Sequence, residues 1–469
     1  MATILEYSAS LGAMFAVIYG ILPWLSQKLL QGGRAPFFSA FGQAGSTDTI
    51  LTISMITNEA LMVLENELTF SSQVLRTYDD SFGVDGAKIG DTLNVRRPPR
   101  FIGTSGPTLN VEDFYQSSIP VVVGDTTKYG DQFHVDTAFT TKDLRLSLGG
   151  FAENVIKPSV AAVANRVDFI GLQMAKNTTA NIVGTYGTAP TALLTYLTAA
   201  AYLDAEAAPR DGSRAVVIEP FTGAAIVDSL KGLFMPDAAI SQQYRKGLMG
   251  RDSAGMNWKM DQNVNTQTTG SWAAASAGTL TADTTSIGIS TGWANTSTIT
   301  LTNSATITLK KGDIISIANV FPVNPQSRQI YGTLTRPFVV QADVTGTGST
   351  TISVSVSPAI ITAGQFQNVS ISSTSATATV TPYKIGLSGT GATSPQNIMF
   401  HKNAYTCAMA DLELPAGVVF AGRAASKEAG ISIRVVRQYT INNDQIPARF
   451  DVLFGWAPLY QELACRVAA

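Results

Sequence analysis

The sequence has few charged residues and almost no excess of one sign. Of its 469 residues, 14% are charged, and 32 basic and 34 acidic side chains give a formal net charge of −2. A typical soluble domain carries about 25% charged residues, and a nucleic-acid-binding domain carries a marked basic excess. The near balance argues against a nucleic-acid binder, and the hydrophobic content of 45% argues against disorder.

Cysteine and histidine are almost absent, with two of each: Cys407, Cys465, His134 and His401. Two cysteines cannot build a disulfide framework or a cysteine-ligated zinc site, and two histidines leave little for a metal site or a proton relay. The motifs H-E-x-x-H, G-x-S-x-G, G-x-x-x-x-G-K-S/T and C-x-x-C are missing as well. We therefore expect no catalytic site, metal or cofactor, and we expect both thiols to be buried and free.

The amino terminus contains an apolar run, Leu11–Leu25. This run is about 15 residues long and is interrupted by Pro23, whereas a membrane-spanning helix needs about 20 apolar residues. A signal peptide carries positive charge before its apolar run, but here Lys28 follows it. Three interpretations of residues 1–45 stay open: an additional amphipathic arm, an unusual membrane segment, or residues upstream of the true start.

A short helix is predicted over residues 57–68, capped by Thr57. Four apolar residues fall on one of its faces at helical spacing: Ala60, Leu61, Leu64 and Leu68. Glu59, Glu65 and Glu67 lie on its flanks and back. These carboxylates indicate either a solvated helix face or a surface for a basic partner.

The strongest helix signal covers Gly150–Lys176. Apolar residues recur there at spacings of 4, 3, 4, 3 and 4 and form one continuous stripe: Ile156, Val160, Val163, Val167, Ile170 and Met174. Such a stripe is typical of a core-facing helix, so we assign no ligand to it. Pro158 is expected to kink this helix or to mark a joint near its start.

An exposed arm is predicted around three arginines. Thr92–Val95 alternates like a strand and is followed by Arg96, Arg97, two prolines and Arg100. Two adjacent prolines cannot lie in a central strand, and Ser117–Val123 can return as the second strand of a long two-stranded arm. The arginines could bind phosphate or a carboxylate. Because the rest of the chain is nearly neutral, we favour contact with protein over contact with nucleic acid.

A Ser/Thr/Gly-rich block follows, with ten charged residues from Lys259 to Lys384. Alternating runs separated by turn signals predict an antiparallel barrel or sandwich; the clearest are residues 297–301, 314–317 and 351–356. Lys310–Asp313 and Gly346–Gly348 are interpreted as hairpin turns within this block.

Mixed α/β character surrounds the block. Helices are expected over Thr191–Ala207 and Thr222–Leu233, and strands over Ala215–Ile218, Ile431–Tyr439 and Arg449–Trp456. The β block therefore looks like an insertion at an exposed loop of an α/β domain.

With these features, the chain resembles the P22-type phage major capsid (coat) protein family. The resemblance covers about nine-tenths of the chain from Thr49 onward, and four segments carry it: Leu51–Ala60, Phe82–Asp91, Val95–Arg100 and Leu309–Ile317. It implies an α+β fold of the HK97 capsid type, with a spine helix, an extended loop, an amino-terminal arm and an inserted antiparallel β-barrel.

The resemblance also implies a domain plan. Residues 1–45 are an extension of uncertain status, which family members do not have. The remaining parts are an amino-terminal arm (46–80), an extended loop and peripheral domain (81–190) with the spine helix at 150–176, an axial domain in two parts (191–258 and 385–430), the inserted barrel (259–384), and peripheral strands (431–469).

The function implied is that of a major capsid protein of a tailed double-stranded DNA phage. Such a protein assembles with a scaffolding protein into an icosahedral shell of hexamers and pentamers. The shell also carries a portal protein and encloses DNA without sequence-specific contact. The chain would lie in the virion, and in the host cytoplasm during assembly, with no membrane partner and no covalent cross-linking between subunits.

Site residues follow from this resemblance. Arg96, Arg97 and Arg100 are expected to contact an adjacent subunit, and Glu59, Glu65 and Glu67 are candidates for binding a basic scaffold helix. The alternative is a secreted Ser/Thr-rich surface or adhesion protein, which the long helix, the double-proline arm and the poor signal sequence argue against. An enzyme is a third possibility that no nucleophile–base pair or metal constellation supports.

Overall fold

The computed structural model describes residues 57–65, 67–76, 92–97, 99–111, 116–140, 156–230, 254–273, 280–285, 287–288, 292–332, 334–348, 350–382, 393–426 and 431–469. All of them belong to one compact unit, Thr57–Ala469. The apolar extension 1–45 and the Phe82–Asp91 segment lie outside the described residues. None of the described helices combines the length and the apolar character that crossing a bilayer requires.

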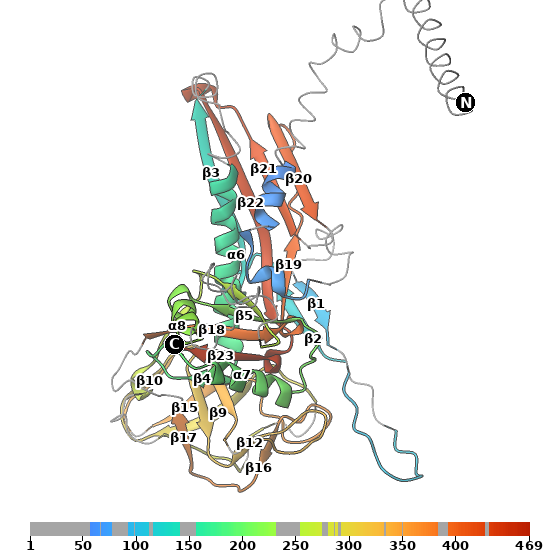
Figure 1. Ribbon diagram of the computed structural model, residues 1–469, viewed down its shortest axis with the longest axis vertical. Helices are drawn as coiled ribbons and strands as arrows, with labels where there is room; N and C mark the ends of the chain where they lie inside the picture. The colour runs from blue at the N-terminus through green and yellow to red at the C-terminus, as the bar shows by residue number, and fades with distance from the viewer. Residues whose placement is uncertain are drawn as a thin grey trace, which may run out of the picture. The chain divides into compact units, whose positions relative to one another are not determined.

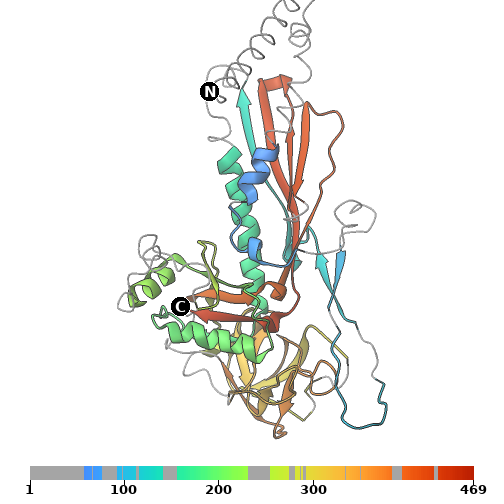
Figure 2. The ribbon, with the colours of Figure 1, turned by 45° about the vertical axis from the view of Figure 1, so that its right-hand side comes forward.

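The spine helix α6 lies along a five-stranded sheet (Figures 1 and 2). The sheet has the order β19-β22-β21-β20, with β3 on the other side of β22. Its strands are β3 (Gly130–Thr140), β19 (Tyr405–Ala410), β20 (Phe420–Ser426), β21 (Ile431–Arg437) and β22 (Gln445–Pro458). The helix and β22 share a core because the long strand turns Phe450, Val452 and Phe454 inward, each at most 1% exposed.

Helix α6 spans Lys157–Thr178, and every residue of its predicted apolar stripe is buried. The stripe is therefore confirmed as core. Pro158 lies in the first turn of the helix, where a missing N–H costs little because that donor has no intrahelical partner. The predicted residues 150–155 lie outside the described residues, so the described helix begins at Lys157.

A second, six-stranded sheet carries two further helices. Its order is β4-β23-β18-β5-β6, and β7 pairs with the beginning of β18. The strands are β4 (Ile182–Gly184), β5 (Arg214–Ile218), β6 (Asn257–Met260), β7 (Thr266–Thr268), β18 (Thr393–His401) and β23 (Ala464–Ala468). Helices α7 (Leu193–Ala205) and α8 (Pro220–Leu230) share its core, into which Tyr196, Leu203 and Ile226 pack.

The Ser/Thr/Gly-rich block forms a closed antiparallel barrel with the order β11-β13-β15-β9-β8-β17. Its strands are β8 (Leu280–Ala282), β9 (Ser297–Asn303), β11 (Ile314–Ile317), β13 (Pro337–Val340), β15 (Thr351–Ser357) and β17 (Ala378–Pro382). Two strand pairs flank it: β10 (Ile307–Leu309) with β14 (Val344–Gly346), and β12 (Val320–Pro322) with β16 (Val369–Ile371). Closure leaves the alternating apolar residues on one inner face, as in small barrels generally.

Short 3-10 helices connect these parts: η1 (Ser71–Gln73), η2 (Thr126–Lys128), η4 (Ser271–Ala273), η5 (Lys402–Ala404), η6 (Ile441–Asn443) and η7 (Gln461–Leu463). The predicted arm helix is observed over residues 57–65 and at residue 67. Of the expected apolar face, Ala60, Leu64 and Leu68 are buried, whereas Leu61 is only half-buried and Val63 is buried in addition.

The two turns of the β block are observed, but neither is a hairpin. Lys310–Asp313 closes with a bond from the Asp313 N–H to the Lys310 carbonyl at 3.0 Å, yet β10 pairs with β14 and β11 pairs with β13 and β17. Gly346–Gly348 likewise leads from β14 to β15, which pair with other strands. Turn residues fix where the chain reverses, whereas the partner strands are chosen by packing across the whole barrel.

Strand pairing divides the chain between the two sheets differently from the expected plan. Strands β19 and β20 fall within 385–430, expected in the axial domain, but they pair in the sheet that lies against α6. Strand β23 falls within 431–469, expected among the peripheral strands, but it pairs with β18 and β4 in the six-stranded sheet. These pairings join residues that are far apart in sequence, and local patterns do not encode them.

The predicted arm begins as an antiparallel pair, β1 (Thr92–Arg96) with β2 (Ser118–Val122). Beyond this pair, the described residues 99–111 contain no strand; residues 99 and 100 are half-buried and residues 101–111 are exposed. Figures 1 and 2 show this loop projecting away from the other described segments. From here on, the name extended loop refers to residues 97–117 alone, which are a part of the segment 81–190 that the resemblance assigns to the extended loop and peripheral domain.

Candidate functional site

The base of the extended loop is anchored by Arg97. This residue follows β1 and continues the side of the strand on which Leu93 and Val95 are buried, and it is only 5% exposed. Its guanidinium carbon lies 4.2 Å from the ring centroid of Tyr460 and 5.0 Å from that of Trp293. Because the two rings exclude water from the guanidinium group, each cation–π interaction is more strongly stabilising than it would be at an exposed site.

The same guanidinium faces an acidic partner from the carboxyl-terminal part of the chain. Arg97 Nη2 lies 3.6 Å from Glu462 Oε2, and both side chains are largely buried. Burial acts to raise the pKa of the Glu462 carboxyl, but the charges of Arg97 and Arg100 outweigh it and hold this pKa below its ordinary value. Glu462 is therefore charged at neutral pH and holds the loop base through electrostatic attraction.

The three arginines thus differ in their surroundings. Arg97 is bound within its own chain, and its expected contact with an adjacent subunit stays a prediction. Its burial follows from strand alternation, since Leu93, Val95 and Arg97 share one face. Arg96 is exposed and Arg100 is half-buried, so these two remain candidates for contact with another subunit.

The outer described part of the extended loop, residues 101–111, mixes apolar and uncharged polar side chains, and Glu112 and Asp113 follow it in the sequence. Residues 101–111 contain no charged side chain, and Leu109 and Val111 are 87% and 79% exposed. Apolar side chains exposed to this degree on a projecting segment are typical of an interface that another molecule covers.

A second anchored junction joins the barrel to α7. Glu206, directly after α7, accepts hydrogen bonds from Tyr331 Oη at 2.5 Å and from Arg336 Nη1 at 2.9 Å. Glu206 and Arg336 are both almost fully buried. A buried pair with this geometry fixes relative position, because breaking it would leave an uncompensated charge in the interior.

Arg466 forms a third junction, which sequence reasoning missed. It lies in β23 and is fully buried, and its guanidinium donates to the carbonyls of Lys176 and Gly312, both at 2.9 Å. Further bonds reach Gln396 Oε1 at 2.8 Å and Tyr186 Oη at 3.2 Å. One side chain therefore ties the end of α6, a barrel turn and two strands of the six-stranded sheet together.

The amino-terminal arm is held on α6 by a buried carboxylate. Asp168 accepts hydrogen bonds from the backbone N–H groups of Thr69, Phe70 and Ser71, at 2.7, 3.1 and 3.0 Å. Burial raises the pKa of Asp168 to about 6, with a smaller contribution from the nearby charge of Asp261, against the lowering effect of these bonds. The carboxylate caps the chain where the arm helix ends.

Next to this cap, Phe70 enters an aromatic cluster. Its ring stacks on Trp456 at 5.2 Å between centroids and lies 5.1 Å from Phe400 and 5.8 Å from Tyr405. Gly171 of α6 makes room for this packing, because a Cβ at that position would lie 2.6 Å from an atom of the Trp456 ring.

The three arm glutamates are not equally accessible to a partner. Glu65 and Glu67 are exposed, whereas Glu59 is half-buried. Their placement fits both interpretations made from the sequence, a solvated face and a surface for a basic partner.

One side-chain group outwardly resembles a catalytic triad. Ser213 Oγ and Asp211 Oδ1 lie 2.9 and 3.2 Å from His401 Nε2, so both contact the same ring nitrogen. The other nitrogen, Nδ1, accepts from the Asn403 N–H at 3.3 Å. In a Ser-His-Asp triad the serine and the aspartate bind opposite nitrogens, and His401 is fully buried. This geometry supports a structural role.

The thiols of Cys407 and Cys465 are free and buried, as predicted. Burial raises the pKa of the Cys407 thiol to about 12, which leaves it protonated and unreactive. Within the part of the chain that the structure describes, no cluster of His, Cys, Asp and Glu side chains could hold a metal ion.

The profile of the P22 coat protein family, gene protein 5, matches residues 52–464. No curated protein matches the sequence significantly.

Several solved structures are similar in fold. A chain in the structure from Mycobacterium phage Che8 is 11% identical in sequence with a TM-score of 0.42. The alignment covers 85% of this chain and 90% of the Che8 chain. A chain in the capsid structure of cyanophage P-SCSP1u is 12% identical with a TM-score of 0.37. The alignment covers 85% of this chain and 86% of the cyanophage chain. A chain in the mature capsid of bacteriophage PhiM1 is 11% identical with a TM-score of 0.38. The alignment covers 81% of this chain and 82% of the PhiM1 chain.

Proposed function

The chain belongs to the P22 coat protein family, and from this premise we propose how its described surfaces serve assembly. As a member of the family it is a major capsid protein of a tailed phage, a structural protein that self-assembles into a shell and lies in the virion. The α+β fold of the HK97 type with an inserted barrel is the fold of this family. We propose that the shell is icosahedral, is built from hexamers and pentamers, and forms with a scaffolding protein in the host cytoplasm.

The observation that carries the proposal is the anchored, projecting loop. Its base is held by Arg97 against Trp293, Tyr460 and Glu462 of the same chain, while its tip exposes Leu109 and Val111. A fixed base lowers the conformational entropy lost when the tip binds. The loop is therefore suited to bridge from one subunit to the next.

Arg96 and Arg100 are proposed to support that contact at its edge. Arg96 is exposed and can pair with a carboxylate of an adjacent subunit at small desolvation cost, whereas Arg100 is half-buried and its charge also acts on Glu462 of its own chain. Such rim contacts mainly set orientation and salt dependence. Alanine at both positions is expected to weaken assembly at low salt more than at high salt.

Glu59, Glu65 and Glu67 are proposed to bind a basic helix of the scaffolding protein. Glu65 and Glu67 are exposed, although their spacing of two places them on different sides of the arm helix, and the arm is fixed to α6 through Asp168. Attraction between exposed charges is screened by salt, so scaffold binding should weaken as ionic strength rises. Salt-sensitive binding that persists after replacing all three by glutamine would refute this role.

The portal protein and packaged DNA are the remaining proposed partners. A net charge of −2 offers no basic excess for phosphate binding, so contact with DNA is expected to be weak and independent of sequence.

The direct test is electron microscopy of the purified protein, expressed with the scaffolding protein of its phage. Two versions are compared: the full chain, and a chain that starts near Thr47. Closed uniform shells from the short version support the proposal and show that the extension is dispensable. Shells from the full chain alone make residues 1–45 an assembly element. Soluble monomers from both versions would contradict the proposed assembly.

A further inference from the structure

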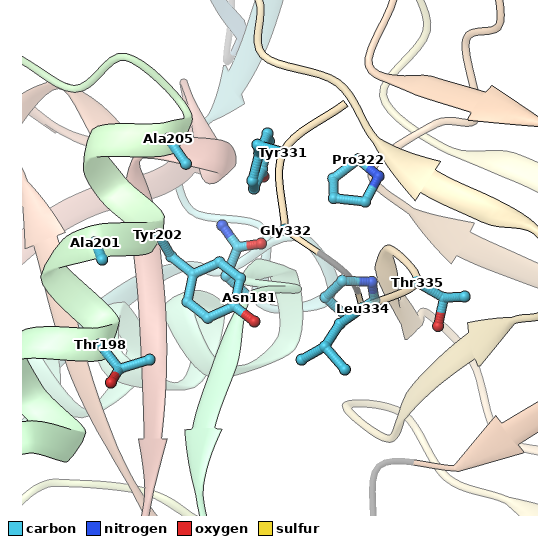
Figure 3. A pocket seen from close by; sticks show the side chains of 11 residues that line it. Asn181, Thr198, Ala201, Tyr202, Ala205, Pro322, Tyr331, Gly332, Leu334 and Thr335 are labelled. Atoms are coloured by element: carbon cyan, nitrogen blue, oxygen red, sulfur yellow. The ribbon is translucent and has the colours of Figure 1, made fainter. Parts of the chain in front are cut away.

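The barrel meets the rest of the chain at two junctions that differ in charge. At the α7 junction, a cleft of about 370 Å³ lies between α7 and the segment that joins β12 to β13 (Figure 3). Figure 3 shows Tyr202 and Leu334 facing each other across it, and no charged residue is among the described residues that line it. The buried charges of this junction, Glu206 and Arg336, are paired with each other. The α7 junction is therefore electrically balanced.

At the α6 junction, three cationic side chains gather around the end of the helix. Lys176 lies in the last turn of α6. Arg466 donates to the backbone carbonyls of Lys176 and Gly312, both at 2.9 Å, and Lys311 precedes Gly312 in the barrel turn. Among the described residues, no carboxylate forms an ion pair with any of these three cations.

Two carboxylates of the barrel lie in the same region, but both bind neutral donors. Asp343 is exposed and accepts from the Lys311 N–H at 2.7 Å. Asp313 is buried and accepts three hydrogen bonds of 2.9, 3.0 and 2.9 Å, from the N–H groups of Lys310 and Gly270 and from Gln267 Nε2. The three cations at the end of α6 therefore lack a negative partner, and an additional anionic group would be attracted to them.

Lys176 itself has the properties of a nucleophilic amine. It is half-buried, and its Nζ donates to the Thr266 carbonyl at 3.2 Å. Burial lowers the pKa of Lys176 to about 8, and the charges of Arg466 and Lys311 lower it further against the opposing charge of Asp313. At pH 8, about half of this side chain is therefore a free amine, compared with about 0.4% of an ordinary lysine. A desolvated lysine beside other cations is a known form of activated nucleophile.

We propose that Lys176 is a site of reversible carbamylation by carbon dioxide, which places an anionic carbamate among the cations at the end of α6. The lone pair of Nζ forms a bond to the carbon of CO₂, one C=O π bond of CO₂ becomes the carboxylate, and Nζ releases one proton to water. The N–H that remains on Nζ can still donate to the Thr266 carbonyl. Lys311 and Arg466 then gain the negative partner that they lack, which stabilises the product.

The modification changes the interaction between α6 and the barrel. Lys176 ends the spine helix, and Lys311 belongs to the turn that precedes β11. In the unmodified chain the charges of these two lysines repel each other, whereas the carbamate attracts Lys311. Carbamylation is therefore expected to strengthen the contact of α6 with the barrel, in single subunits as well as in shells, so this inference goes beyond the proposed function and does not depend on it.

The test traps the carbamate on the unassembled full-length chain. The protein is equilibrated at pH 8 with ¹³C-labelled bicarbonate and CO₂, ethylated with triethyloxonium so that the carbamate becomes permanent, digested, and analysed by mass spectrometry. The internal control is Lys259 in β6, which is half-buried like Lys176. We expect about tenfold more label on Lys176 than on Lys259. Equal labelling of the two lysines, or no label on Lys176, would overturn the inference.

Three variants separate the effect of the cationic cluster from the reactivity of the lysine alone. Lys311→Met removes one neighbouring cation and should lower the label on Lys176 about threefold or more. Lys311→Arg keeps the charge and should keep the label, which excludes misfolding as the cause of a loss, and Lys310→Met, at the exposed next position, should also keep it. CO₂ should raise the Tm of the wild type but not that of Lys176→Met. Labelling that ignores Lys311→Met, or an equal response of both Tm values, would show that the inference is wrong.

Discussion

Replacing Asp168 by asparagine changes both the charge and the bonding of the cap that holds the amino-terminal arm on α6. In the wild-type chain, one buried carboxylate accepts from three backbone N–H groups, those of Thr69, Phe70 and Ser71. Asparagine keeps one acceptor oxygen but turns an NH₂ group toward donors. At neutral pH, the unsatisfied donors should lower the free energy of unfolding by about 1–3 kcal/mol. The net loss is smaller than this because the variant no longer buries a charge.

The pH dependence gives the sharper result. Burial raises the pKa of Asp168 from its ordinary value of 3.8 to about 6, so the folded protein binds this proton more tightly than the unfolded chain. The contribution to stability is therefore full at low pH and is lost as the pH rises from about 4 to about 6. A shift of about two pKa units corresponds to about 3 kcal/mol, of which about 2 kcal/mol remains at pH 4.5.

The assay is urea unfolding of unassembled subunits between pH 4.5 and 7.5, for the wild type and for Asp168→Asn. Subtracting the two curves removes the titration of other groups, which both proteins share. The wild type should gain about 2 kcal/mol relative to the variant on going from pH 7.5 to 4.5. A constant difference, or one of opposite sign, would mean that the three N–H donors outweigh burial and hold the pKa of Asp168 at or below its ordinary value.

Three other predictions follow from the packing and the junctions. Gly171→Ala places a Cβ 2.6 Å from the Trp456 ring and should lower the stability by about 1–3 kcal/mol, seen as a lower Tm. Arg466→Met leaves the Lys176 and Gly312 carbonyls without their donor and should cost about 3–5 kcal/mol in urea unfolding; an unchanged midpoint would show that water replaces it. Arg97→Met releases the loop base from Glu462 and should speed trypsin cleavage after Arg100 about tenfold, which corresponds to ~1.4 kcal/mol of local opening. Leu109→Ala, which leaves the base intact, should not speed that cleavage.

The features that the sequence predicts well are those whose pattern is local. The apolar stripe of α6 repeats every three or four residues, so both the helix and its buried face follow from spacing alone. Strand alternation does the same for β9, β11 and β15, whose predicted runs all lie in the closed barrel. The barrel was predictable as a class because closure is the common solution for many short alternating strands.

The features that the sequence does not predict depend on distant partners. Arg97 was expected to contact another subunit. However, Leu93, Val95 and Arg97 are alternate residues along β1 and its continuation and share one face, and this spacing indicates burial within the chain. Its partners Trp293, Tyr460 and Glu462 lie about 200 or more residues away, and no local signal links them. The Arg466 junction went unnoticed for the same reason, since all its acceptors come from other elements.

The pairing of β7 with the beginning of β18 has a consequence for how such a chain can evolve. Thr268 and Thr393 are opposite each other in this ladder, with their hydroxyl oxygens 2.9 Å apart. The segment between Thr268 and Thr393, which includes the barrel, therefore begins and ends at two adjacent positions of the six-stranded sheet. A single recombination event can therefore exchange the whole module for a tight turn or for a foreign domain, and the strand order of the parent sheet stays the same. The junctions at Glu206 and Arg466 are what a newly acquired module would have to rebuild.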